Sequence, residues 1–213
     1  MYYPYYYGFD MTYIVLVLPC ILLSLWASAN VKSTFNRYSR QYSQRRLTGA
    51  EAAQRVLMAN GVRGVRIERV SGNLTDHFDP KTNVIRLSDS VYANTSTAAI
   101  GVACHEAGHA VQYAQNYFPI KIRAAIIPIT NFGSKLAMPL VLIGLLLDYT
   151  SYAVNPELGF HIAMIGVLLY GGSLLFALVT LPVELNASRH AGKMLVESGI
   201  LANDELPAAK EVL

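Results

Sequence analysis

Two histidines and a glutamate stand in the spacing of a metal-dependent hydrolase. The run His105-Glu106-Ala107-Gly108-His109 places two imidazoles four residues apart, and on a helix residues with that spacing project from nearly one face. His105 and His109 can therefore bind one metal ion, while Glu106 can reach a water on that metal without ligating it. The motif predicts a Zn²⁺-dependent hydrolase in which Glu106 is the catalytic base.

A zinc ion that hydrolyses bonds needs a third protein ligand and one position for water. Glu184 is the preferred candidate, because it follows a long apolar segment and Pro182, and can begin a helix that returns to the motif helix. The alternative role for Glu184 is an interfacial carboxylate that pairs with Arg189 or a lysine. Five other side chains of ligand type remain open as competitors: Asp76, His77, Asp79, Asp89 and His190.

Three apolar segments are long enough to cross a bilayer as helices. They cover residues 13–31, 124–147 and 158–183, near or above the roughly 20 residues that a hydrocarbon core requires. The chain is 53% hydrophobic and only 15% charged, against roughly 25% charged in soluble domains. A cleavable signal peptide at Ala27-Ser28-Ala29 competes for the first segment, but no lysine or arginine precedes it. We therefore expect three transmembrane helices.

The positive charges predict how these helices are oriented. All of the 17 lysines and arginines except Lys135 lie in residues 32–123 and 184–213. Because positively charged loops stay in the cytoplasm, the tail over residues 1–12 and the loop over residues 148–157 are expected outside the cell. Lys135 either extends its charge toward the interface, marks a later start of the buried span, or faces the active site. The active site is thus expected on the cytoplasmic side of the plasma membrane.

Residues 32–123 are the stretch long enough for a folded subdomain, and residues 184–213 form a second, helical cytoplasmic segment. The strand expected over residues 84–87 is a candidate to pair with an extended substrate, with an ordinary core strand as the alternative. The fold class is therefore a mainly α membrane protein with a small α+β zincin-like cytoplasmic subdomain. Its expected elements are a helix after the capping box Thr48-x-x-Glu51 that ends at Asn60-Gly61, a strand over 62–70, turns over 73–83, a strand over 84–87, and a helix from 94–96 to about Gln115.

Composition and context exclude some functions and leave two rivals. A net charge of +3 without a basic stripe argues against a nucleic-acid partner. Cys20 and Cys104 lack the spacing of a disulfide framework, which fits a reducing compartment. An intramembrane protease is disfavoured because the polar residues Gln112, Gln115 and Asn116 follow the motif. A membrane adaptor or pseudoenzyme with a structural zinc is the alternative from another class.

Five stretches resemble the YugP-type membrane zinc metallopeptidases of bacteria, also called neutral zinc metallopeptidases. The resemblance covers nearly the whole chain and implies a zinc peptidase of the membrane that acts on proteins or peptides. YugP-type relatives tend to continue with further apolar sequence past the position of Leu213, and a missing part of that kind is expected to reduce stability or activity. The matching stretches are LTGAE at 47–51, LTDHFDP at 74–80, VIRLS at 84–88, HEAGHAVQ at 105–112 and LPVELNASR at 181–189.

The chain is more distantly similar to the HtpX-type and prenyl-protein peptidases, which place a membrane hairpin between HExxH and a later glutamate. That resemblance implies proteolysis on the cytoplasmic side, membrane-protein quality control, and the ligand set His105, His109 and Glu184 with Glu106 as base. Those peptidases have an aspartate four residues after the ligand glutamate, where this chain has Ser188. Four residues are therefore candidates for supporting roles: Asn186 and Ser188 beside the ligands, and Arg189 or His190 at the oxyanion.

Overall fold

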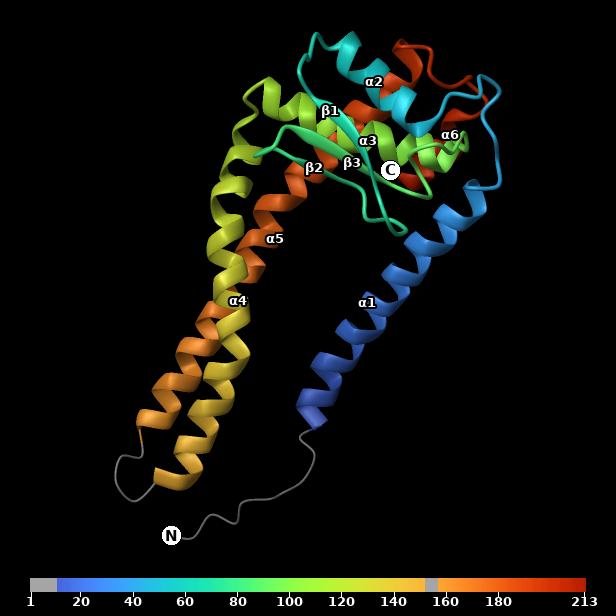
Figure 1. Cartoon of the computed structure of the whole chain (residues 1–213). Helices are drawn as coiled ribbons and strands as arrows, with labels where there is room; N and C mark the ends of the chain where they lie inside the picture. The colour runs from blue at the N-terminus through green and yellow to red at the C-terminus, as the bar shows by residue number, and fades with distance from the viewer. Residues whose placement is uncertain (1–10, 152–156) are drawn as a thin grey trace.

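The computed structural model describes residues 11–151 and 157–213 and is mainly helical. Figure 1 shows a small domain at one end of the molecule, with α1 as one leg below it and the paired α4 and α5 as the other. The predicted tail over 1–12 lies almost wholly outside the described residues, and so does half of the predicted loop over 148–157. In chain order the elements are α1 (Met11–Tyr38), α2 (Gly49–Ala59), β1 (Arg66–Val70), β2 (His77–Asp79), β3 (Val84–Ser88), α3 (Thr97–Ala114), α4 (Phe118–Ser151), α5 (Leu158–Glu197) and α6 (Leu206–Val212).

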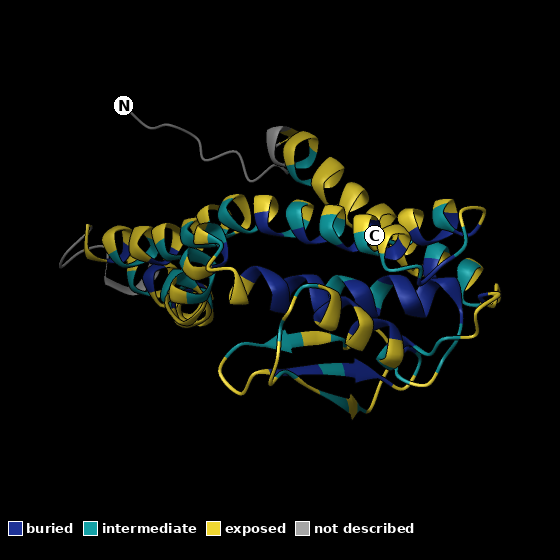
Figure 2. Ribbon diagram, turned by 90° about the horizontal axis from the view of Figure 1, so that it is seen from above, coloured by how far each residue is buried: buried dark blue, intermediate teal, exposed yellow. Residues whose placement is uncertain are grey.

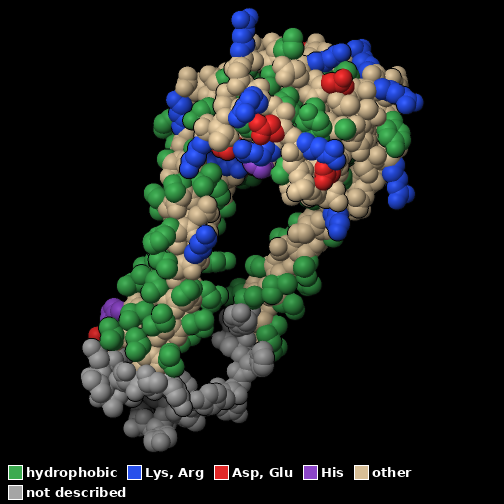
Figure 3. Space-filling model, in the orientation of Figure 1, with side chains coloured by type: hydrophobic (Ala, Val, Ile, Leu, Met, Phe, Trp, Pro, Cys, Tyr) green, Lys and Arg blue, Asp and Glu red, His purple; other side chains and the backbone are tan. Residues whose placement is uncertain are grey.

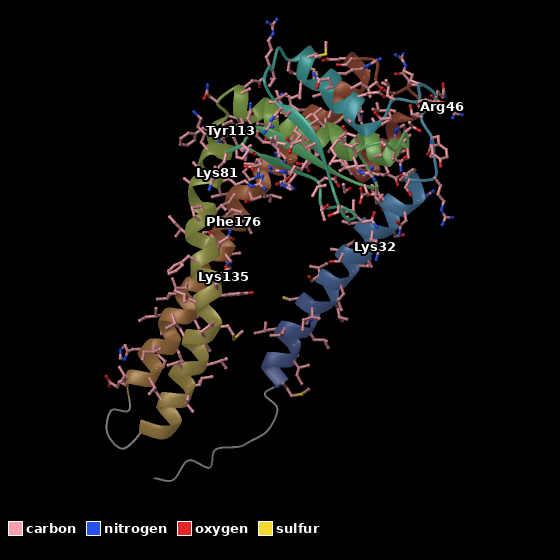
Figure 4. The ribbon with its side chains drawn as sticks, in the orientation of Figure 1. Lys32, Arg46, Lys81, Tyr113, Lys135 and Phe176 are labelled. Atoms are coloured by element: carbon pink, nitrogen blue, oxygen red, sulfur yellow. The ribbon has the colours of Figure 1, made fainter. Side chains whose placement is uncertain are left out.

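The two legs together contain three helices, α1, α4 and α5, that are long and apolar enough to cross a membrane, as the sequence predicted. Their large apolar side chains are exposed, whereas buried residues concentrate in α3 and the central strand (Figure 2). An exposed apolar surface of that extent needs a partner, and lipid supplies one. Lysines and arginines gather on the domain at the top, and Lys135 stands apart, exposed midway along α4 (Figures 3 and 4).

Helices α4 and α5 continue past the predicted spans into the domain. Helix α4 begins at Phe118 rather than Ala124, and α5 runs through Pro182 without ending. The expectation that Glu184 begins a new helix is therefore wrong. A proline inside a helix removes one backbone hydrogen bond, but the following turn is held because Val183 and Ala187 are fully buried against α3.

The sheet has three strands in the order β1-β3-β2, with β1 parallel and β2 antiparallel to β3. The strand predicted over 62–70 starts only at Arg66, because the Val62 N–H donates to Leu57 O and so completes the end of α2. Strand β2 was missed, since the sequence over 73–83 is rich in turn residues. With three residues, β2 owes its extended form to pairing with β3 rather than to its own pattern.

Strand β3 is not the strand that could receive an extended substrate. Both of its edges are occupied, by β1 on one side and β2 on the other. Its Val84, Ile85 and Leu87 are fully buried, so it is the core strand of the alternative interpretation. The edge strand on the side of α3 is β2.

The helix starts of the domain follow the predicted signals. The Thr48 side chain accepts from the Glu51 N–H at 3.2 Å, and the Glu51 carboxylate accepts from the Thr48 N–H at 2.8 Å, which completes a capping box. Ser96 caps α3 by accepting from the Ala99 N–H at 3.2 Å. Helices α2 and α3 then pack on each other, with side chains such as Leu57 and Ile100 fully buried. Each such side chain stabilises the domain by roughly 1.5–3 kcal/mol.

Glycines bring α4 and α5 into backbone contact along the hairpin. A Cβ added at Gly166 would lie 2.6 Å from the Ala137 carbonyl oxygen, and one at Gly144 would lie 2.5 Å from the Ala163 nitrogen. Small residues allow this close packing, which is the main source of helix association in lipid. The hairpin is therefore sensitive to added volume at these two glycines.

We predict that Gly166→Ala lowers the midpoint of thermal unfolding of the detergent-solubilised protein, because the new methyl group forces α4 and α5 apart. Gly171→Ala on the same helix is the matched control, since a Cβ there meets no atom within 4 Å. The control is expected to leave the midpoint unchanged or slightly higher, as alanine favours helix. Equal shifts for the two variants would contradict the packing described here.

Candidate metal centre

Three side chains of metal-ligand type converge between α3 and α5. Their ligand atoms all lie within 4.8 Å of one another. One oxygen of Glu184, Oε2, is 3.1 Å from His105 Nε2 and 3.3 Å from His109 Nε2. Two imidazole nitrogens and one carboxylate oxygen therefore surround a space that a single cation can fill.

The convergence depends on how closely α3 and α5 approach. A Cβ added at Gly108 would lie 3.1 Å from the backbone oxygen of Ala187, tighter than most Cβ contacts. Gly108 is between the two histidines of α3, and Ala187 follows Glu184 by three residues, nearly one turn of α5. The missing side chain at position 108 thus permits the approach that brings Glu184 to the histidines.

Hydrogen bonds to the other ring nitrogens orient both histidines. His109 Nδ1 lies 3.0 Å from Gln112 Oε1, and the Gln112 amide donates to Val183 O at 2.9 Å and to Asn186 Oδ1 at 2.7 Å. Because both amide protons are used on α5, the oxygen must face the imidazole and accept from its Nδ1–H. The Nε2 lone pair of His109 is then free for a metal.

His105 is oriented in the same way. Its Nδ1 lies 3.3 Å from Ser188 Oγ, and that hydroxyl donates to Leu213 O at 3.0 Å. The hydroxyl proton is committed to the carbonyl, so Ser188 accepts from the Nδ1–H of His105. Both Nε2 atoms are thus presented on the side of Glu184, in the arrangement typical of metal-ligating histidines.

Glu106 lies beside the cluster but points to the sheet. Its Oε2 accepts from the backbone N–H of Phe78 on β2 at 3.0 Å, and the side chain is nearly buried. Burial raises the pKa of the Glu106 carboxyl, while His109 and His105 act against that rise. The pKa of His109 is lowered by burial but raised on balance by its contacts with Glu184 and by the charge of Glu106.

A cleft of about 210 Å³ opens at this cluster. Figure 3 shows histidine atoms on the underside of the domain, above the space between the legs. One wall of the cleft comes from the first turns of α4, and Tyr113 lies near the start of that helix (Figure 4). The cleft is lined by Asp76, His77, Phe78, Pro80, His105, Glu106, His109, Tyr113, Ile120, Arg123, Ala124, Ile127 and Glu184.

The other candidate ligands do not join the cluster. Among the described residues, no second group of three ligand-type side chains comes as close together. His77 lines the cleft, but its Nδ1 bonds to Thr75 O at 2.9 Å. His190 Nδ1 lies 3.3 Å from Asn186 O and the residue does not line the cleft. The three aspartates have partners around the sheet: Asp76 with Ser88 at 2.7 Å, Asp79 with Arg86 at 3.0 Å and Asp89 with Arg69 at 2.6 Å.

The four residues expected in supporting roles divide into two pairs. Asn186 and Ser188 reach the histidines, Asn186 through Gln112 and Ser188 directly. Arg189 and His190 line no part of the cleft, and Arg189 belongs to a different hollow between α5 and α6. Neither of them is placed to stabilise an oxyanion.

Sequence reasoning missed two residues of this centre. Gln112 was noted only as polar, although it follows His109 by three residues and thus shares its helix face. Arg123 was counted only as a charge before a membrane span, and its Nη1 lies 3.1 Å from Glu184 Oε1. No local pattern marks Arg123, because its contact with Glu184 joins the beginning of α4 to the second half of α5, which are far apart in the sequence.

The donor set fits zinc. Two imidazoles and a carboxylate are the protein ligands of one class of catalytic zinc site, which leaves a fourth position for water. Both imidazoles have the hydrogen-bond partners that such ligands require. Neither cysteine competes, since Cys104 is buried away from the cleft and Cys20 is on α1.

Comparisons with known proteins agree with this chemistry. The family model described as "Putative neutral zinc metallopeptidase" matches residues 13–213. A protein of Bacillus subtilis (strain 168) named "Putative membrane protease YugP" is 40% identical over 203 residues, which cover 95% of this chain and 86% of that protein. No solved structure matches the chain significantly.

We predict that Gln112→Leu weakens zinc binding about 10- to 100-fold, the usual effect of removing a residue that orients a metal-ligating histidine. The substitution keeps the volume but leaves His109 Nδ1, Val183 O and Asn186 without their partner. Competition with a chelator of known affinity measures the change. Gln115→Leu, at the exposed end of the same helix, is the control. If both variants bind zinc as the unaltered protein does, the orienting role is refuted.

Proposed function

The chain belongs to the family of neutral zinc metallopeptidases, and on that premise we propose that it hydrolyses peptide bonds at the centre formed by His105, His109 and Glu184. The observation that carries the proposal is the convergence of one carboxylate oxygen and two imidazole nitrogens from helices far apart in the sequence. Glu106 is close enough to the same cleft to act on a water held there.

The residues have separate roles in this proposal. His105, His109 and Glu184 would hold a zinc ion, which would act as the Lewis acid that lowers the pKa of a water molecule and polarises the scissile carbonyl. Glu106 takes the proton of the water and passes it to the leaving amine. Burial raises the pKa of its carboxyl, and a carboxylate whose pKa lies nearer the working pH is a better proton acceptor.

The edge strand β2 supports an extended substrate in the cleft. Phe78 and His77 of β2 line the cleft, and no described strand pairs with the outer edge of β2, where the Phe78 N–H donates to Glu106. An extended peptide can add to such an edge by backbone hydrogen bonds. We therefore assign to β2 the part that the sequence had suggested for β3.

A site at the membrane surface is favoured over one inside the bilayer. Glu184 follows Leu158 by 26 residues, about 39 Å along a helix, whereas the hydrocarbon core is about 30 Å thick. The apolar wall of the cleft, with Ile120, Ala124 and Ile127, belongs to the first turns of α4. We propose that the site acts on the cytoplasmic side of the plasma membrane, on chain segments near the bilayer, as membrane-protein quality control requires.

A structural zinc in an adaptor or pseudoenzyme finds less support. A closed structural site needs four protein ligands, and the cluster among the described residues has three. The open cleft beside them is suited to a substrate.

We predict that the purified protein holds about one zinc and cleaves casein, that Glu106→Gln keeps the metal but loses cleavage at least 100-fold, and that Glu184→Ala loses the metal. Metal content by mass spectrometry and a casein assay measure these outcomes. Glu197→Ala is the control on α5, because its exposed carboxylate pairs only with Lys193 among the described residues. A protein without zinc, or full cleavage by Glu106→Gln, would overturn the proposed function.

The proposed orientation has its own test. Glu157→Cys, at the start of α5, is expected to react with a membrane-impermeant thiol reagent on intact cells. Glu197→Cys, at the other end of α5, should react only after the cells are permeabilised. The unsubstituted chain serves as background, since Cys104 is fully buried and Cys20 lies in a candidate span. The reverse labelling pattern would place the site outside the cell.

A further inference from the structure

We propose that Arg123 is a positioning residue that restricts Glu184 to metal ligation through one oxygen. The inference rests on the proposed function, since it concerns the ligand Glu184. Arg123 is on α4 at the point where that helix passes under the cleft, and it has no part in the motifs that define the metal centre.

The two oxygens of Glu184 are divided between different partners. Oε2 faces the histidines, at 3.1 Å from His105 Nε2 and 3.3 Å from His109 Nε2. Oε1 faces Arg123, whose Nη1 lies 3.1 Å away. Opposite charges at this distance attract each other, and more strongly where water is partly excluded. Oε1 is therefore held back from the space that Oε2 shares with the imidazoles.

Glu184 is the one charged partner of Arg123 among the described residues. The Arg123 Nε is buried and has no hydrogen-bond partner among them. A buried N–H without a partner costs about 1–3 kcal/mol. Arg123 nevertheless lies at the cleft, where 27% of its side-chain surface is exposed.

The division of the carboxylate has a consequence for the reaction. A carboxylate can bind a metal through one oxygen or two, and the second oxygen of Glu184 would take up the place that a hydrolytic zinc reserves for water. By holding Oε1, Arg123 keeps that place free. Glu106, which lines the same cleft, can then act on the water.

Cobalt substitution tests the proposal, because four-coordinate Co²⁺ absorbs visible light more strongly than five-coordinate Co²⁺. Arg123→Gln removes the charge and is expected to hold one Co²⁺ with weaker visible absorption and to cleave casein about 10- to 100-fold more slowly. Arg123→Lys keeps the charge and should recover part of both signals. Lys121→Gln, an exposed position on the same helix, is the matched control and should behave as the unaltered protein does.

The outcomes separate this inference from the proposed function. If the unaltered protein binds metal and cleaves casein, but Arg123→Gln has the unaltered cobalt spectrum or binds no cobalt at all, the positioning role is overturned and the peptidase stands. If the unaltered protein itself binds no metal, the proposed function fails first. Arg123→Met is a second neutral variant of similar length, and it takes the place of Arg123→Gln if the thermal unfolding of the latter shows a misfolded protein.

Discussion

The close approach of α3 and α5 is the constraint on which the rest of the centre depends. Gly108 allows the α3 backbone to lie against Ala187, and the turns on either side then bring the functional groups into reach. Glu184 arrives at the two histidines from one side of the contact. Gln112, one turn after Gly108, spans the same two helices through its amide. A glycine in the middle of a helix lowers helix stability by about 1 kcal/mol relative to alanine. The close packing of α3 on α5 offsets that loss.

The same contact connects the metal centre to the long apolar helices. Helix α5 is continuous from Leu158 to Glu197, so Glu184, which faces the histidines, and the apolar part of the hairpin belong to the same helix. Helix α4 packs along α5 through backbone contacts at Gly144 and Gly166 and contributes the lower wall of the cleft. The lower wall of the cleft is therefore in place only when α4 is paired with α5, which links the packing of the hairpin to the shape of the site.

Two glutamates in one cleft have opposite environments, and this difference separates their chemistry. Glu106 is nearly buried, and burial raises the pKa of its carboxyl, although the backbone N–H of Phe78 donates a hydrogen bond to it. Glu184 is surrounded by groups of positive or potentially positive charge, Arg123 and both histidines. A carboxylate in the first environment can exchange a proton, whereas one in the second stays ionised and available to a cation.

Features that depend on neighbours along the chain could be predicted from the amino-acid sequence. The HExxH run, the capping box at Thr48 and Glu51, and three apolar segments were all readable, because helix periodicity, capping and hydropathy are local. Glu184 could be predicted as a ligand, but it was expected at the start of a new helix and lies inside α5. Tertiary structure alone decided that β2 forms the sheet edge beside α3, that α5 continues through Pro182, and that Arg123 and Gln112 contact the ligands. Each of these features depends on the packing of elements that are distant in the chain. The free energy of such packing does not produce a periodic pattern in the sequence.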